Sequence, residues 1–265
     1  MSGSISGGLA INKSDSSILY LGGNNSYTGT TNIYGGTVVV QSATALGNGA
    51  VYVFGPGKSP HTGNLQLANI TGNVAESIIL YDNAQLQNTA GNNGVSGPIT
   101  ICGGIAGFAN NVPGTTLSIG GNIWTTGGSG SGLAVSGSGN TTISGNIGGS
   151  SFDAGLLKSD TGTLILSGTN TYAGGTTVSD GLLVINRSAA LPSGSILSIG
   201  ASGSVELGDS TLNGTAIPLG GSPSAGTLAP QGIAAGGIHA VPELGTLVLL
   251  AAAACGLAIR RKKGI

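Results

Sequence analysis

The chain has 265 residues, of which 52 are glycine, 6% are charged and 4% are aromatic. An ordinary soluble protein has about 25% charged residues. The net charge of −1 and the mean hydropathy of +0.32 exclude disorder driven by high net charge. No Gly-X-Y period is present, which excludes collagen. A stacked solenoid tolerates this composition, because each coil buries a small cross-section and neighbouring coils share backbone hydrogen bonds.

Basic residues are concentrated at the end of the chain. Four of the eight lie at 260–263, so residues 1–259 hold four basic and nine acidic groups and carry a net charge of about −5. Nucleic-acid binding needs a basic face, so no nucleic-acid partner is expected. The first eight residues have neither a basic nor an apolar region and are not a signal peptide. We expect an upstream segment with a signal peptide, because a repeat pattern already runs at residue 9.

An internal repeat recurs at an offset of 145 residues, since residues 9–55 align without gaps on residues 154–200. The matched residues include Lys13 with Lys158, Asp15 with Asp160, Asn25 with Asn170, Tyr27 with Tyr172, Gly36 with Gly181, and Leu46 with Leu191. In each unit a short apolar run is followed by a turn rich in Gly and Asn and then by two β-branched runs. Leu19 to Val38 and Leu164 to Leu183 are both nineteen residues, a suitable length for one coil.

Short apolar or β-branched runs predict further strands between and after the units. They lie at 51–54, 65–68, 77–81, 85–88, 99–101, 116–119, 132–135, 141–144, 196–199 and 204–207. No amphipathic helical period appears before residue 241, and the connections are short, which argues against alternating strands and helices. A β-sandwich is the alternative, but paired units with nineteen-residue coils favour a parallel solenoid.

The second unit, residues 164–178 followed by Gly181 to Val184, resembles the autotransporter-associated β-strand repeat of large bacterial surface proteins. The first unit is a weaker copy, with Thr30 in place of Gly175. The resemblance implies an all-β, right-handed parallel β-helix over residues 1–207. Eight side chains should then point inward, in stacked apolar ladders. They are Leu19, Leu21, Val38, Val40, Leu164, Leu166, Leu183 and Ile185.

Residues 208–240 are rich in Gly, Pro, Ser and Ala and are predicted to be a flexible spacer. The tail, residues 241–265, contains an apolar segment at 244–259. As a helix this segment is about 24 Å long, short of the roughly 30 Å hydrocarbon core of a membrane. A short C-terminal transmembrane helix is expected, with its basic end on the cytoplasmic side.

The order of the tail resembles the PEP-CTERM sorting signal, which is recognised by the membrane peptidase exosortase. The signal residues are Val241, Pro242, Glu243, Arg260, Arg261, Lys262 and Lys263. Leu244 departs from the pattern, because the family usually has a second proline there. The resemblance implies export, a transient anchor in the inner membrane through residues 244–259, and delivery to the cell surface or extracellular matrix. A plain single-pass anchor is the alternative.

No sequence motif of hydrolases, zinc proteases, phosphate-binding loops or dinucleotide-binding folds is present, so no catalytic residue, cofactor or metal site is expected. His61 and His239 are interpreted as solvated loop residues. Cys102 and Cys255 are interpreted as small buried apolar residues rather than a disulfide.

Carboxylates bear on glycan cleavage, because glycoside hydrolysis needs two of them within about 10 Å. Asp15 and Asp160 occupy equivalent repeat positions and should lie some seven coils, over roughly 30 Å, apart. Asp153 with Asp160, or Glu206 with Asp209, could approach each other, but a solvated-loop role is favoured for them.

Polar and aromatic residues of the repeat are given structural roles. Tyr27 and Tyr172 are predicted to cover the coil edge and pack on neighbouring turns, with sugar stacking as the alternative. Asn25 and Asn170 are predicted to satisfy backbone groups at their turns. Trp124 is either buried or a platform for a sugar ring, and the sequence leaves both alternatives open.

These observations predict a non-catalytic, exported, structural or adhesin-like surface protein whose partners are exosortase, the inner membrane and, as an option, extracellular polysaccharide. A carbohydrate-binding or carbohydrate-active β-helix is the first alternative. A fragment of an autotransporter passenger is the second. It is disfavoured because an autotransporter ends in a β-barrel with strands of roughly ten residues, whereas this chain ends in an apolar, basic segment.

Overall fold

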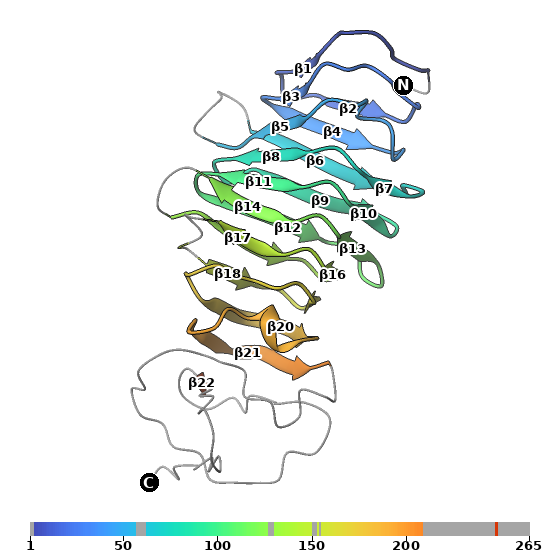
Figure 1. Cartoon of the computed structure of the whole chain (residues 1–265). Helices are drawn as coiled ribbons and strands as arrows, with labels where there is room; N and C mark the ends of the chain where they lie inside the picture. Colours follow the sequence, from blue (N-terminus) through green and yellow to red (C-terminus); the bar gives the residue numbers. More distant parts are fainter. Residues whose placement is uncertain are drawn as a thin grey trace, which may run out of the picture.

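A computed structural model describes residues 3–56, 62–126, 130–149, 153 and 155–208, together with a short strand at 247–248. These residues form a parallel β-solenoid of about eight turns that starts at the N-terminus (Figure 1). The only helical element among the described residues is the 3-10 helix η1, Ser188–Ala190. Within the same residues, no helix is long and apolar enough to cross a membrane.

The first face of the solenoid is a seven-stranded parallel sheet. Its strands are β1 (Ile11–Lys13), β3 (Thr31–Ile33), β5 (Val51–Phe54), β8 (Ile78–Tyr81), β11 (Ile99–Cys102), β14 (Ile123–Thr126) and β17 (Ile147–Gly149).

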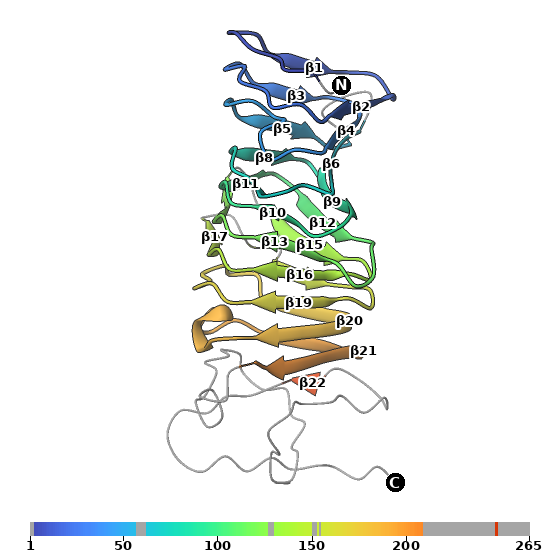
Figure 2. The ribbon, with the colours of Figure 1, turned by 90° about the vertical axis from the view of Figure 1, so that its right-hand side faces the viewer.

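The second and third faces belong to one fifteen-stranded sheet that folds around a corner. The second face stacks β2 (Ile18–Leu21), β4 (Gly36–Val40), β6 (Gly63–Ala68), β9 (Gln85–Ala90), β12 (Ile105–Asn110), β15 (Gly132–Ser136) and β18 (Gly155–Lys158). The third face stacks β7 (Asn73–Val74), β10 (Asn93–Val95), β13 (Thr116–Ile119), β16 (Asn140–Ile143) and β19 (Thr163–Leu166). Figure 2 shows β10, β13, β16 and β19 of this face one below the other.

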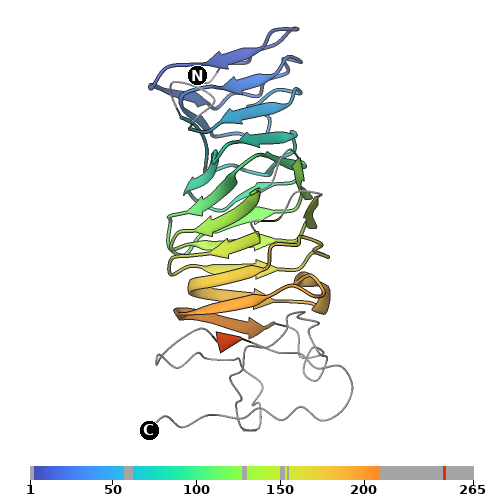
Figure 3. The same ribbon diagram turned by 90° about the vertical axis from the view of Figure 1, so that its left-hand side faces the viewer.

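Two long strands join these faces at the C-terminal end of the stack. The first half of β20 (Thr176–Ile185) pairs with β18 and its second half pairs with β19. The next strand, β21 (Leu197–Leu207), pairs with β20 along both halves, with a register shift at the corner. Figure 3 shows the solenoid from the side opposite to that of Figure 2.

The register confirms the predicted coil length. Leu19 lies beside Val38, and Leu164 lies beside Leu183, which is nineteen residues in each unit. Coils between the units are longer: Val51 lies beside Ile78, twenty-seven residues further on. The extra residues of this coil lie between β5, which ends at Phe54, and β6, which begins at Gly63.

Apolar side chains fill the interior in ladders, as the alternation of buried and exposed residues along the strands requires. Of the eight residues predicted to point inward, seven are buried. Leu19 is only partly buried against the core cluster. It lies on β2, which pairs with β4 alone and therefore has core on one side only.

The two repeat units occupy different faces. In the first unit the strands β1 and β3 lie on the first face, and β2 and β4 lie on the second. In the second unit the equivalent pair, β18 and the start of β20, lies on the second face, and β19 with the end of β20 lies on the third. The second unit is therefore displaced by six coils plus one face, rather than by the seven coils expected from the sequence.

The C-terminal predictions fall largely outside the described residues. These include the spacer predicted at 208–240, of which only Gly208 is described, and the sorting-signal residues Val241 to Glu243 and Arg260 to Lys263. Within the expected helix at 244–259, the structure describes only β22 (Leu247–Val248), which pairs antiparallel with Ser198 and Ile199 of β21. These two residues form a strand and not a helix, because the outer edge of β21 offers backbone groups for pairing.

Candidate functional surface

Each repeat unit contains a buried lysine held by main-chain carbonyls. The Nζ of Lys158 donates to the carbonyl oxygens of Ser159 and Asp160, both at 2.5 Å, and of Asp180 at 3.3 Å. Lys158 is 1% exposed. Burial lowers the pKa of its ammonium, although the charges of Asp160 and Asp180 act in the opposite direction. The lysine therefore ties its own turn to the following coil.

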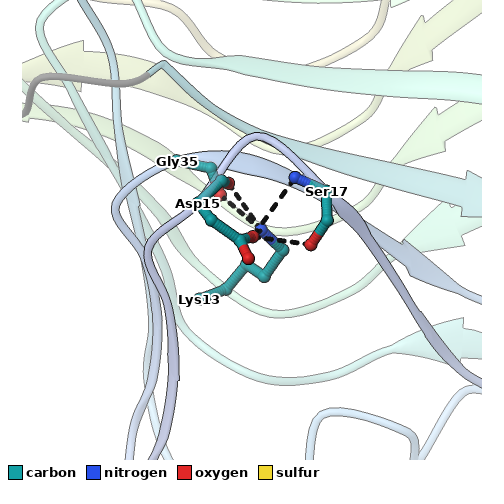
Figure 4. Close-up of polar contacts among 4 residues, drawn as sticks. All are labelled: Lys13, Asp15, Ser17 and Gly35. Atoms are coloured by element: carbon teal, nitrogen blue, oxygen red, sulfur yellow. Dashed lines mark hydrogen bonds and ion pairs between the residues drawn. The ribbon is translucent and has the colours of Figure 1, made fainter.

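Lys13 occupies the equivalent place in the first unit (Figure 4). Its Nζ donates to the carbonyl oxygens of Asp15 at 2.5 Å and Gly35 at 3.2 Å, and it also contacts the Asp15 carboxylate. This carboxylate accepts the Ser17 hydroxyl at 2.6 Å as well. The hydrogen bonds from Lys13 and Ser17 hold the pKa of Asp15 well below its usual range.

A glycine closes each lysine site. Gly36 and Gly181 have φ angles of 68° and 72°, in the left-handed region that favours glycine. A Cβ at Gly36 would lie 2.7 Å from Lys13 Nζ, and a Cβ at Gly181 would lie 2.8 Å from Lys158 Nζ. The lysine and the glycine thus recur together in both units for one reason: the lysine is enclosed by the backbone, and a side chain at the glycine would collide with it.

Tyr27 and Tyr172 are inside the solenoid, not at its surface. They are 0% and 1% exposed, and each hydroxyl bonds a threonine, Thr31 at 2.5 Å and Thr176 at 2.6 Å. Burial raises the pKa of both phenols. The structure confirms the packing role and leaves no ring surface on these residues for a sugar.

Asn25 and Asn170 each bridge three coils. Asn25 accepts a hydrogen bond from the amide of Ile5 at 2.8 Å and donates to the carbonyl of Ala45 at 2.6 Å. Asn170 does the same with Ile147 at 2.8 Å and Ala190 at 2.6 Å. The predicted backbone role is confirmed, with partners in the coils before and after rather than in the same turn.

A buried asparagine cluster in the middle coils was not found from the sequence. Asn88 donates to Asn110 Oδ1 at 3.0 Å and accepts from Asn93, while Asn110 also donates to the carbonyl of Asn140 at 2.7 Å. All three of these asparagines, Asn88, Asn93 and Asn110, are at most 3% exposed. Their spacing of 22 residues from Asn88 to Asn110 is one coil, which is the signal that could have identified the cluster.

Two of the carboxylates considered for glycan cleavage, Asp153 and Asp160, accept hydrogen bonds from the backbone. Asp153 accepts the amide of Gly130 at 2.6 Å, and Asp160 accepts the amide of Gly137 at 2.9 Å. Glu206 lies on β21, while Asp209, His61, His239 and Cys255 lie outside the described residues. Over the part of the chain that the structure describes, no three His, Cys, Asp or Glu side chains gather as a metal site would require.

The outer side of the first face carries most of the accessible aromatic rings. Tyr34 and Phe54 stack with centroids 4.7 Å apart, and Phe54 and Tyr81 stack at 5.0 Å. Cys102 follows Tyr81 in register and contacts Thr126 through its sulfur at 3.2 Å. Cys102 is therefore not buried as predicted, because alternation on β11 turns it outward.

Trp124 also points outward from the first face, and it is 45% exposed. It lies beside Gly148 of the next coil, where an added Cβ would be 3.4 Å from the indole Cζ3. The structure thus excludes burial, one of the two alternatives left open for this residue.

Comparison with known proteins finds one match for each repeat unit. Residues 11–40 and 156–185 match the family model of the passenger-associated transport repeat, and these are the two segments that build the lysine sites. No curated protein sequence matches the chain, and no solved structure does. The match supports an autotransporter-associated repeat family, and together with the β-solenoid it fits an exported, passenger-like surface protein.

Proposed function

We propose that the chain is a non-catalytic surface rod, exported and delivered to the cell surface or extracellular matrix, where it acts as a structural or adhesin-like component. The observation that carries the proposal is the pair of repeat matches within a continuous parallel solenoid. The buried lysines and asparagines that the repeats share join neighbouring coils, and the buried tyrosines bond a threonine within their own coil. Such groups serve rigidity rather than chemistry.

The proposed delivery route uses the tail as a sorting signal. Exosortase would recognise the segment around Val241, Pro242 and Glu243 while Arg260 to Lys263 hold the chain at the cytoplasmic side. A basic cluster acts as a stop because Lys and Arg each cost about 2.5–3.5 kcal/mol at the centre of a membrane helix.

The mature C-terminus tests this route. Mass spectrometry of the protein from its native host should find an end upstream of Arg260. A mature protein that retains Arg260 to Lys263 would instead mean a permanent anchor. Replacing those four residues by Ser should cause missorting, measured by protease accessibility on intact cells, and unaltered surface delivery would contradict the sorting signal.

A second experiment tests the absence of catalysis. A variant with Asp153, Asp160 and Asp209 changed to Asn and Glu206 changed to Gln should behave like the wild type toward polysaccharides. If the purified wild type releases reducing ends from a polysaccharide and the variant does not, the protein is an enzyme and the proposal is wrong.

A further inference from the structure

The outer side of the first face concentrates aromatic residues in a chain that has few. The sequence holds ten, and five of them point outward there: Tyr34 directly after β3, Tyr52 and Phe54 on β5, Tyr81 on β8 and Trp124 on β14. Tyr27, Phe108 and Tyr172 are buried in the interior, and Tyr20 lies on the second face. Solvent-facing rings are costly in water, so their collection on one face calls for a reason.

The rings follow the axis of the solenoid. Tyr34, Phe54 and Tyr81 form a continuous stack across three successive strands, with interplanar angles of 17° and 3°. Tyr52 and Trp124 belong to the neighbouring column, three strands apart. From β3 to β14 the array crosses four strand spacings, which is about 19 Å. A ligand that touches the whole array must therefore be extended and lie along the axis.

The same face is uncharged. No carboxylate, ammonium or guanidinium side chain projects outward from its seven described strands, because Lys13 turns inward and Asp82 lies in the turn after β8. Between the rings lie amides and hydroxyls, namely Asn12, Asn32, Thr100 and Thr126. A nucleic acid or an acidic glycan would need cations, and the described strands of this face offer none on their outer side.

We propose that the outer side of the first face binds an uncharged polysaccharide chain, laid along the solenoid axis. The C–H groups of a sugar ring pack against the exposed indole of Trp124, and against the outer edges of Tyr34, Phe54 and Tyr81, whose faces cover one another in the stack. The sugar hydroxyls exchange hydrogen bonds with amides and threonines. The neutral surface, the axial array and the mixture of rings with short polar side chains all match this chemistry. The inference goes beyond the proposed function and does not depend on the export route.

Affinity electrophoresis of the full chain tests the proposal. Native gels contain one polymer each: hydroxyethylcellulose, laminarin or galactomannan as neutral probes, and polygalacturonate as the acidic one. At least one neutral polymer should retard the wild type. Trp124→Ala and Phe54→Ala should each weaken the retardation constant about tenfold, equivalent to one aromatic contact. Tyr20→Ala removes an exposed ring from the second face and should leave retardation unchanged.

Intrinsic fluorescence gives an independent readout, because Trp124 is the only tryptophan in the chain. Titration with oligosaccharides of the retarding polymer should shift its emission, and circular dichroism should show that every variant is folded. Retardation by none of the neutral polymers, or by polygalacturonate alone, overturns the proposal. So does a wild type that is dimeric in sedimentation and becomes monomeric in Trp124→Ala, since the face would then bind a second copy of the chain.

Discussion

The two repeat units, residues 11–40 and 156–185, share a sequence pattern but differ in their surroundings. The first unit lies at the end of the stack, where β1 and β2 each have one neighbouring strand. Its lysine is paired with the carboxylate of Asp15. The second unit has strands on both sides, and the Nζ of Lys158 is bound by carbonyls only, while the Asp160 carboxylate turns to the amide of Gly137. The same sequence pattern thus places the lysine in an ion pair at the end of the stack and among uncharged carbonyl groups in its interior.

The largest expected effect concerns the two lysines. Lys158→Ala leaves three carbonyls of a buried site without their donor and should lower the free energy of unfolding by about 3 kcal/mol. Lys13→Ala should cost about 1 kcal/mol, because water can reach the groups around the exposed Asp15. Urea unfolding followed by circular dichroism measures both, with the exposed Arg187→Ala as control. Equal losses for the two lysines would contradict the comparison.

The next effect concerns Gly175, which aligns with Thr30 of the first unit. Gly175 has a φ of 80°, and a Cβ there would lie 2.9 Å from the carbonyl oxygen of Ile196. Gly175→Thr should therefore cost about 2 kcal/mol through backbone strain. The reverse change, Thr30→Gly, should cost only about 0.5–1 kcal/mol through chain entropy. Thermal midpoints compare the two, and Gly175→Asn, which tolerates positive φ better, should lie between them.

The buried tyrosines are expected to have a smaller effect than the glycine, and the effect should be equal for Tyr27 and Tyr172. Tyr27→Phe and Tyr172→Phe each remove one hydroxyl that bonds a threonine, so each should cost about 1 kcal/mol in urea unfolding. Adding Thr176→Val to Tyr172→Phe removes both partners and should recover part of the loss. A difference of more than about 1 kcal/mol between the two single variants would mean that the units do not share this contact energetically.

The tyrosines also give a pH dependence. Because burial raises the folded pKa of Tyr172 above its ordinary value of 10.0, its contribution to stability is complete below pH 10 and is lost as the pH rises further. Lys158 acts in the opposite direction: its folded pKa lies below 10.5, so stability rises with pH in the window just below that value. Urea midpoints of the wild type and Tyr172→Phe between pH 9 and 11 separate the two, since the variant should lose less at the upper end.

The smallest effect concerns Asp15, whose carboxylate is at the surface. Its folded pKa lies below the ordinary 3.8, so its contribution is complete above that value and is lost as the pH falls toward the folded pKa. Between pH 5 and pH 3, the protection factors of β2 amides, which correct for the pH dependence of intrinsic exchange, should fall in the wild type. The change should be smaller in Asp15→Asn, and the amides of β19 should serve as the internal control. Equal acid sensitivity of β2 in both proteins would contradict the ion pair.

Periodicity explains how much of this could be predicted. The offset of 145 residues, the nineteen-residue coil and most strands between them follow from apolar and β-branched runs, and the structure confirms them. Seven strands of the solenoid were missed, namely β1, β7, β10, β12, β14, β17 and β18. The residues of β10, β12 and β17 are mostly Gly, Asn and Ala, and the neighbouring coils rather than intrinsic preference hold these three strands extended.

The direction in which a side chain points was harder to predict than the position of the strand that carries it. Which side of a strand faces inward depends on where each coil turns its corners, and the middle coils vary in length from 21 to 27 residues. The sequence therefore left Trp124 undecided and assigned Cys102 to the wrong side. The buried asparagine cluster was missed for the same reason, since Asn88 and Asn110 look like turn residues until the coil length is known.

The shift of the second unit by one face has a consequence for how such rods would meet one another. Translation along the axis alone cannot superpose one copy on the other, because a turn about the axis is needed as well. If two rods lay side by side with the first repeat units of both in contact, the surfaces in contact at the height of the second units would thus come from a different face. Because the second copy is rotated about the axis as well as translated along it, the coil keeps its inner contacts. The outer surface, however, does not offer neighbouring molecules one uniform stripe along which they could associate.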